Sequence, residues 1–192
     1  MIRKNKTKYA VLGLLSHQPA SGYDIKKVFE RYIGKFWNES YGQIYPMTKS
    51  LVDEGYSTCE VERSEGKPDR HVFSITDKGL EELQEWLAQP TEPHKERLEV
   101  LLKLMCGAHM PAEANIRLIE RFRSEWSNHL KSYAEIRAEL HAEYKDNPHL
   151  PYWLMSVNCG MHLGNAYIAW CDETIETLKA MNKETTEEPS KQ

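Results

Sequence analysis

SYGQIYPMTKSLVDEG (Ser40–Gly55) is followed by TCEVER (58–63), SEGKPDR (64–70), HVFSIT (71–76) and DKGLEELQEWL (77–87). This stretch predicts a short helix ended by a glycine, two strands joined by a basic turn, and a second helix. A helix followed directly by a β-hairpin is the arrangement of a winged helix, whose helix enters a DNA groove while the hairpin lies along the backbone. The stretch therefore predicts a DNA-binding unit.

The first helix of this stretch has a predicted start and end. Pro46 lacks an amide hydrogen and belongs in the first turn, and Gly55 suits a left-handed C-cap. Ile44, Met47 and Leu51 would then face inward. The opposite face can contact bases and phosphates. The candidate DNA-binding residues are Ser40, Tyr41, Gln43, Tyr45 and Lys49 here, and Lys67 and Arg70 in the basic turn of the hairpin.

The hairpin and the elements around it follow simple patterns. Cys59 and Val61 alternate with Glu60 and Glu62, which indicates a strand with one buried face, and the second strand alternates in the same way. Thr76 would cap the following helix, which we expect to turn Leu80, Leu83, Trp86 and Leu87 inward.

Upstream, residues 8–16 predict a short apolar helix that Gln18-Pro19 ends. Ser21 and Asp24 form a capping-box pattern at the start of the next helix. Its expected apolar stripe is Ile25, Val28, Phe29, Tyr32, Ile33 and Phe36.

The charge is unevenly distributed. The whole chain carries a net charge of −4, whereas residues 1–50 contain nine Lys or Arg and three acidic residues, a balance of +6. The remainder therefore carries −10. A basic region on an acidic protein suits phosphate contact, because binding depends on the local field. An ordinary solvated surface would give the same count.

The second half predicts long helices. After a short linker and a helix near Leu98–Met105, residues 111–144 carry apolar residues at spacings of three, four and seven, and so do residues 152–181. Such long helices need a second chain to cover their stripes, which predicts a homodimer and a DNA operator with two-fold symmetry. Gly160 and Gly164 would allow close helix packing.

The predicted fold is mainly α with a small β-hairpin. We expect an N-terminal winged helix-turn-helix domain over residues 1–90, a C-terminal helical dimerisation domain with long antiparallel helices over 91–181, and a disordered tail over 182–192. The four cysteines show no metal-ligand spacing, and neither a signal peptide nor a membrane span is evident, so a cytoplasmic protein with reduced thiols is expected.

Several ordered motifs resemble the PadR family of bacterial transcriptional regulators: KYAVLGLL (8–15), SGYDI (21–25), GKFW (34–37), GQIYP (42–46), EGKPDR (65–70) and SITDKG (74–79). The resemblance is closest to the phenolic-acid repressors and the AphA-like virulence activators, and it is looser in the second half. Thr48 stands where the family pattern has a core leucine, and Ser57 where an apolar residue is usual. The rotation of the recognition helix is therefore left open, with Met47 able to turn inward.

The resemblance to the phenolic-acid repressors implies a pocket for a small phenolic or aromatic acid between the two halves. Aromatic rings would stack on such a ligand and a histidine could bind its carboxylate. The candidate effector-binding residues are His17, Tyr23, Trp37, Trp126, His129, Trp153, Met161 and His162. An ordinary role in the core or an interface is the competing interpretation for each.

Other function classes are less well supported. The chain has no nucleophile elbow, phosphate-binding glycine loop or zinc-protease motif, so we expect no enzyme, cofactor or metal site. A protein-interaction module that no longer binds DNA is a stronger rival, because the net charge is negative. Whether a regulator of this kind represses, or activates as the AphA-like members do, depends on the operator position and cannot be derived from the residues.

Overall fold

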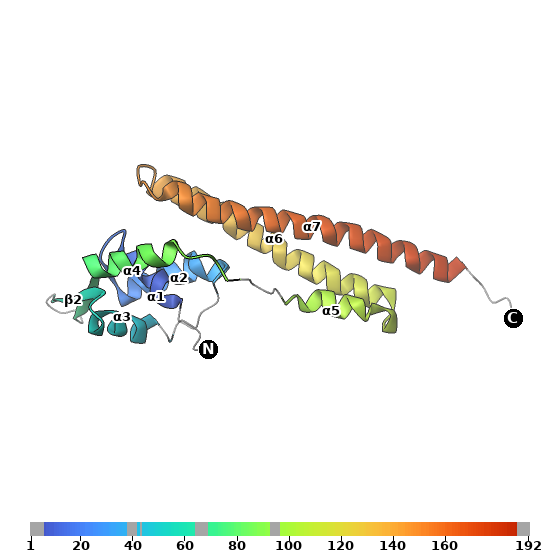
Figure 1. The fold of residues 1–192 in the computed structure, drawn as a ribbon. Coiled ribbons are helices and arrows are strands. Elements are labelled where there is room, and N and C mark those ends of the chain that lie inside the picture. The colour runs from blue at the N-terminus through green and yellow to red at the C-terminus, as the bar shows by residue number, and fades with distance from the viewer. Residues whose placement is uncertain (1–5, 38–41, 43, 64–68, 93–96, 188–192) are drawn as a thin grey trace. The chain divides into compact units, whose positions relative to one another are not determined.

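The computed structural model describes residues 6–37, 42, 44–63, 69–92 and 97–187, with side chains as far as Asn182. The chain divides into two compact units, residues 1–93 and residues 94–192 (Figure 1). We describe each unit by itself.

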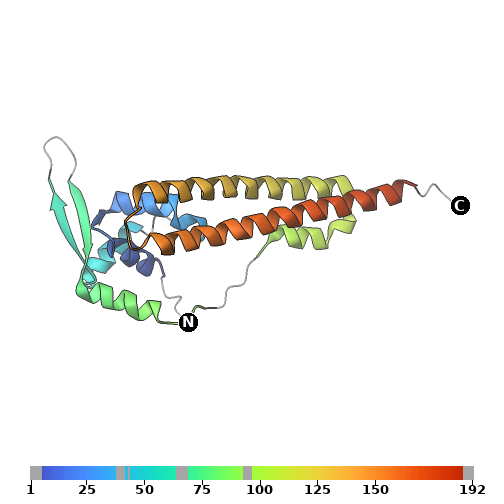
Figure 2. The same ribbon diagram turned by 90° about the horizontal axis from the view of Figure 1, so that it is seen from above.

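The first unit is a winged helix-turn-helix, which confirms the predicted fold class. Its elements are α1 (Thr7–Leu15), β1 (Ala20–Ser21), α2 (Gly22–Arg31), η1 (Ile33–Lys35), α3 (Ile44–Asp53), β2 (Ser57–Glu62), β3 (Arg70–Ile75) and α4 (Asp77–Leu87). The sheet is antiparallel with the order β1-β3-β2. In Figure 2 the β2–β3 hairpin projects away from the helices. The two-residue strand β1, which the sequence did not predict, pairs Ala20 with Phe73 and Ser21 with Val72.

The core of this unit lies between α1, α2, α3 and the sheet. Val11, Leu12, Ile25 and Leu51 are fully buried there, and each such side chain contributes about 1.5–3 kcal/mol by leaving water. The Tyr9 and Trp86 rings stack with their centroids 4.5 Å apart, which joins α4 to α1.

Local sequence signals set the element ends. Ser21 and Asp24 form the predicted capping box of α2. Thr76 accepts a hydrogen bond from the Gly79 amide at 3.1 Å and caps α4 as predicted. Gly55 adopts a φ of 75° after α3, a left-handed conformation that glycine reaches without steric cost.

Three inward assignments in this unit are wrong. The α2 helix ends at Arg31 and continues into a 3-10 turn, so the helical spacing breaks and Phe36 is 67% exposed. Leu80 and Leu87 are 39% and 65% exposed, because α4 turns Gly79 inward instead, where a Cβ would collide with the Tyr56 carbonyl oxygen. Val61 is 45% exposed because the hairpin extends beyond the core.

The second unit is built from α5 (Glu99–Met105), η3 (Gly107–His109), α6 (Ala112–Glu143) and α7 (Leu150–Glu187). The helices α6 and α7 contain 32 and 38 residues and run antiparallel along each other (Figure 2). Their close approach depends on the two predicted glycines. A Cβ on Gly164 would lie 2.7 Å from Leu130 Cδ2, and one on Gly160 would collide with the Tyr133 ring.

The last helix is longer than the sequence predicted. It begins at Leu150 and ends at Glu187, so residues 182–187 continue the helix, although they were assigned to a disordered tail; residues 188–192 lie outside the described residues. No helix in the described ranges is long and apolar enough to cross a membrane. The described side chains also include no cluster of three His, Cys, Asp or Glu that could bind a metal ion.

Candidate nucleic-acid interface

The rotation of α3 is determined by three buried side chains. Ile44, Thr48 and Leu51 are 4%, 1% and 0% exposed. Thr48 takes the inward position that Met47 was expected to fill, and its hydroxyl donates a hydrogen bond to the Tyr45 carbonyl at 2.9 Å. Burying this hydroxyl is therefore compatible with the core, because its hydrogen-bonding capacity is satisfied locally.

The opposite face of α3 is open to solvent. Tyr45 is 68% exposed, and Gly42, Pro46 and Lys49 are exposed beside it. At the other end of the helix, Lys78 Nζ donates to the Glu54 carbonyl at 2.7 Å and lies 4.6 Å from the Tyr56 ring centroid. A cation at a helix C-terminus is stabilising, so α3 is held firmly while its outward face stays accessible.

Much of the positive charge in this unit is already paired. Lys6 pairs with Glu92 at 2.9 Å, Lys8 with Glu82 at 3.0 Å, and Lys26 with Glu30 at 3.6 Å. Burial alone would lower the pKa of Lys8, but the hydrogen bond and charge of Glu82 outweigh it and raise that pKa. By contrast, the Lys49 ammonium has no such partner within the described ranges.

The wing places Arg70 away from the tip. Arg70 is the first residue of β3, opposite Glu62 in the sheet register. Its guanidinium pairs with Glu62 at 3.1 Å and with Asp24 at 2.7 Å. Asp24 and Glu62 were not among the candidate site residues. The register of the hairpin could have indicated Glu62, whereas Asp24 lies 46 residues from Arg70 and no local pattern connects them.

The structure brings together only some of the predicted DNA-binding residues. Tyr45 and Lys49 share the exposed face of α3, and Arg70 lies at the base of the wing. The other four candidates, Ser40, Tyr41, Gln43 and Lys67, lie outside the described residues.

The effector candidates of the first unit are not all alike. His17 and Trp37 are half-buried. Tyr23 is 64% exposed, and the Lys27 ammonium lies 4.9 Å from its ring centroid.

The effector candidates of the second unit form two separate groups. The Trp126 ring centroid lies 5.2 Å from that of His129 and 4.6 Å from that of Tyr167. Trp153 instead packs edge-on against Tyr144, about 27 Å further along α6 at 1.5 Å per residue. Met161 is half-buried and His162 exposed on α7. Tyr167, which the sequence analysis named only within a family motif, belongs with Trp126.

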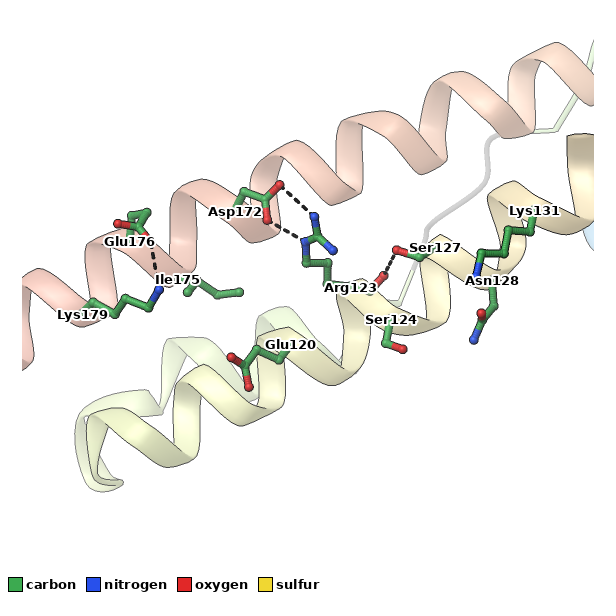
Figure 3. Close-up of a pocket in the computed structure, with 10 residues that line it drawn as sticks. All are labelled: Glu120, Arg123, Ser124, Ser127, Asn128, Lys131, Asp172, Ile175, Glu176 and Lys179. Atoms are coloured by element: carbon green, nitrogen blue, oxygen red, sulfur yellow. Dashed lines mark hydrogen bonds and ion pairs between the residues drawn. The ribbon is translucent and has the colours of Figure 1, made fainter.

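A shallow groove of about 590 Å³ also lies between α6 and α7. Figure 3 shows Arg123 reaching across it to Asp172, and the two ion-pair distances are 2.6 and 3.3 Å. The hydrogen bond from Arg123 lowers the pKa of the Asp172 carboxyl. The lining is polar, carries both signs of charge and includes none of the effector candidates, so it does not resemble a site for an aromatic acid.

Two family models match the chain. Residues 11–85 match the transcriptional regulator PadR-like family, and residues 96–179 match the C-terminal domain of virulence activator alpha. Together they span both units.

Two characterised proteins are similar over most of their length. The negative transcriptional regulator PadR of Bacillus subtilis is 29% identical over 180 residues, which are 91% of this chain and 96% of the relative. Its crystal structure with operator DNA aligns with a TM-score of 0.78 at 26% identity, covering 90% of this chain and 98% of that one. Its structure with p-coumaric acid aligns at 0.75 and 25% identity, covering 93% and 98%. The Vibrio cholerae virulence activator AphA is 30% identical, with a TM-score of 0.71 and coverage of 91% and 98%.

Proposed function

Because this chain belongs to the PadR-like family of transcriptional regulators, we propose that it is a homodimeric repressor that a small aromatic acid releases from its operator. That it is a DNA-binding transcriptional regulator and not an enzyme follows from the family. Repression, the dimer, the two-fold symmetric operator, the effector and a cytoplasmic location are the parts proposed here.

The exposed face of α3 carries this proposal. Ile44, Thr48 and Leu51 fix the helix to the core, so Tyr45 and Lys49 project together from the unit. A lysine can bind phosphate or guanine, and a tyrosine can contact phosphate or a thymine methyl group. Gln43, which precedes α3, can pair with an adenine edge.

The homodimer is proposed from the second face of α7. Tyr152, Met155 and Leu163 are 68%, 63% and 51% exposed, and Cys159 lies exposed on the same stripe. The helix already uses another face, with Gly160 and Gly164, against α6. A second copy would cover the open stripe, and its α3 would then read the second half of a symmetric operator.

The effector proposal draws on the relative that was solved with p-coumaric acid. In this chain Trp126, His129 and Tyr167 offer rings for stacking and an imidazole for a carboxylate. A hydroxycinnamate such as p-coumarate is the proposed ligand class. If instead the protein is an AphA-like activator, it would bind its operator without responding to such a ligand.

The operator experiment is a gel shift with the DNA upstream of the protein's own gene, repeated at several salt concentrations. We expect Lys49→Ala to weaken binding and to reduce the slope of log affinity against log salt by about 0.9. Lys145→Ala, an exposed lysine of the second unit, is the control and should leave binding unchanged. Equal binding by Lys49→Ala and the wild type would remove Lys49 from the interface. The absence of any sequence preference would favour a protein-interaction module.

The effector experiment adds p-coumarate to the preformed complex. We expect millimolar ligand to release the DNA and to raise the melting temperature of the free protein, since a ligand stabilises the state it binds. No change in either measurement would contradict the effector and favour the AphA-like alternative.

A further inference from the structure

Asp24 links the base of the wing to the first turn of α2. Its Oδ2 accepts hydrogen bonds from the Ser21 amide at 3.0 Å, the Ser21 hydroxyl at 2.6 Å and Arg70 Nη2 at 2.7 Å. Through Nη1, Arg70 also donates to Glu62 Oε2 at 3.1 Å. One guanidinium therefore connects β2, β3 and the N-terminus of α2.

The geometry restricts the wing in three directions. Arg70 and Glu62 are cross-strand partners, and Ser21 pairs with Val72 in β1. The planar guanidinium donates in fixed directions, so two carboxylates on different elements hold its plane. Because α2 packs against α3, the angle of the wing is fixed relative to the helix that carries Tyr45 and Lys49.

We propose that Arg70 is a positioning residue, which supports operator binding by holding the wing through Asp24 rather than by binding a phosphate itself. Asp24, Glu62 and Arg70 together carry a net charge of −1, and two nitrogens of the guanidinium are already engaged by carboxylates. A phosphate would be repelled by this trio and would have to replace one of its bonds. The inference rests on the proposed operator binding.

Asp24→Asn distinguishes the two roles by the sign of its effect. If Arg70 bound a phosphate, removing the competing carboxylate would free the guanidinium and make the unit more basic, so the operator would bind more tightly. In the positioning role the same substitution loosens the wing and weakens binding. Asparagine keeps an acceptor for the Ser21 amide, so the cap of α2 is largely retained.

The experiment measures operator affinity against salt for the wild type, Asp24→Asn, Arg70→Ala and the double variant. Each single variant should bind about threefold to fivefold more weakly, the range of an exposed ion pair. The double variant should be no weaker than either, with the salt slope unchanged. Glu30→Gln is the matched control, since it removes one exposed acid from the same helix without touching Arg70; it should bind as tightly as the wild type or more so.

Two outcomes would overturn the positioning role: tighter binding by Asp24→Asn, or a salt slope reduced by about 0.9 in Arg70→Ala, which is the signature of a lost phosphate contact. Hydrogen exchange without DNA separates this inference from the proposed function. Amides of β2 and β3 should exchange faster in Arg70→Ala and Asp24→Asn, and no faster in the double variant. Unchanged exchange contradicts the link, whereas faster exchange in a protein without an operator contradicts only the proposed function.

Discussion

Gly79 is the residue at which the packing of the first unit is least tolerant. A Cβ there would collide with the Tyr56 carbonyl oxygen and would lie 2.9 Å from Ile75 Cγ1. We expect Gly79→Ala to lower the free energy of unfolding by about 1–3 kcal/mol, the usual cost of forcing extra volume into a packed site. Urea unfolding followed by circular dichroism measures this change.

The control for this prediction is Gly13→Ala in α1, where an added Cβ would have nothing within 4 Å. Alanine favours a helix over glycine by up to about 1 kcal/mol, so this variant should be as stable as the wild type or more stable. Equal effects of the two substitutions would mean that space around Gly79 is not the limiting factor.

Thr48 shows why a single position can leave a helix rotation open. From the sequence, an inward Met47 and an inward Thr48 were both compatible with the pattern around Ile44 and Leu51. The structure selects Thr48 because its hydroxyl is satisfied within the helix, by the Tyr45 carbonyl. A threonine can thus occupy a core site at modest cost.

The N-terminus of α2 depends on one carboxylate. Burial alone would raise the pKa of Asp24, but hydrogen bonds from Ser21 and Arg70 outweigh it and hold that pKa below its ordinary value. The unfolded chain therefore binds a proton more readily than the folded protein near pH 4. The stability that Asp24 contributes is present above about pH 4 and is lost as the pH falls through the lower pKa of the folded state.

The test compares urea unfolding of the wild type and Asp24→Asn from neutral pH to about pH 2.5. We expect the wild type to be the more stable at neutral pH and the difference to vanish in acid. Asp172, Glu99 and Glu113 also have lowered pKa values, but they are present in both proteins and cancel in the difference. A difference that stays constant with pH would contradict the role of the Asp24 charge.

Element ends and element contacts differ in how well the sequence predicts them. The capping box, the Thr76 cap and the Gly55 turn are encoded by neighbouring residues and were predicted correctly. The outward position of Leu80, the two-residue strand β1 and the link between Arg70 and Asp24 depend on residues far apart in the chain. Periodicity cannot reveal these features, because tertiary packing decides them.

At the scale of the whole molecule, the open stripe of α7 predicts how the protein assembles. Leu163→Glu would place a charge in an apolar interface without a partner, which is strongly destabilising for association. We expect this variant to elute as a monomer under conditions in which the wild type is a dimer, measured by size-exclusion chromatography with light scattering.

Asn165→Glu is the matched control, since Asn165 is exposed on α7 but lies off the stripe. It should remain a dimer. A Leu163→Glu protein that also remains a dimer would place the interface elsewhere on the second unit, and the exposed side chains of α5, Leu102 at 64% and Met105 at 85%, would be examined next.

The strand order β1-β3-β2 leaves the sheet with two open edges. One edge is only two residues long, and the other, β2, carries the exposed acids Glu60 and Glu62. Open edges invite strands of other molecules, and short or charged edges discourage such pairing. The wing can therefore project into solvent, as a DNA-reading hairpin must, with little tendency to aggregate in a crowded cell.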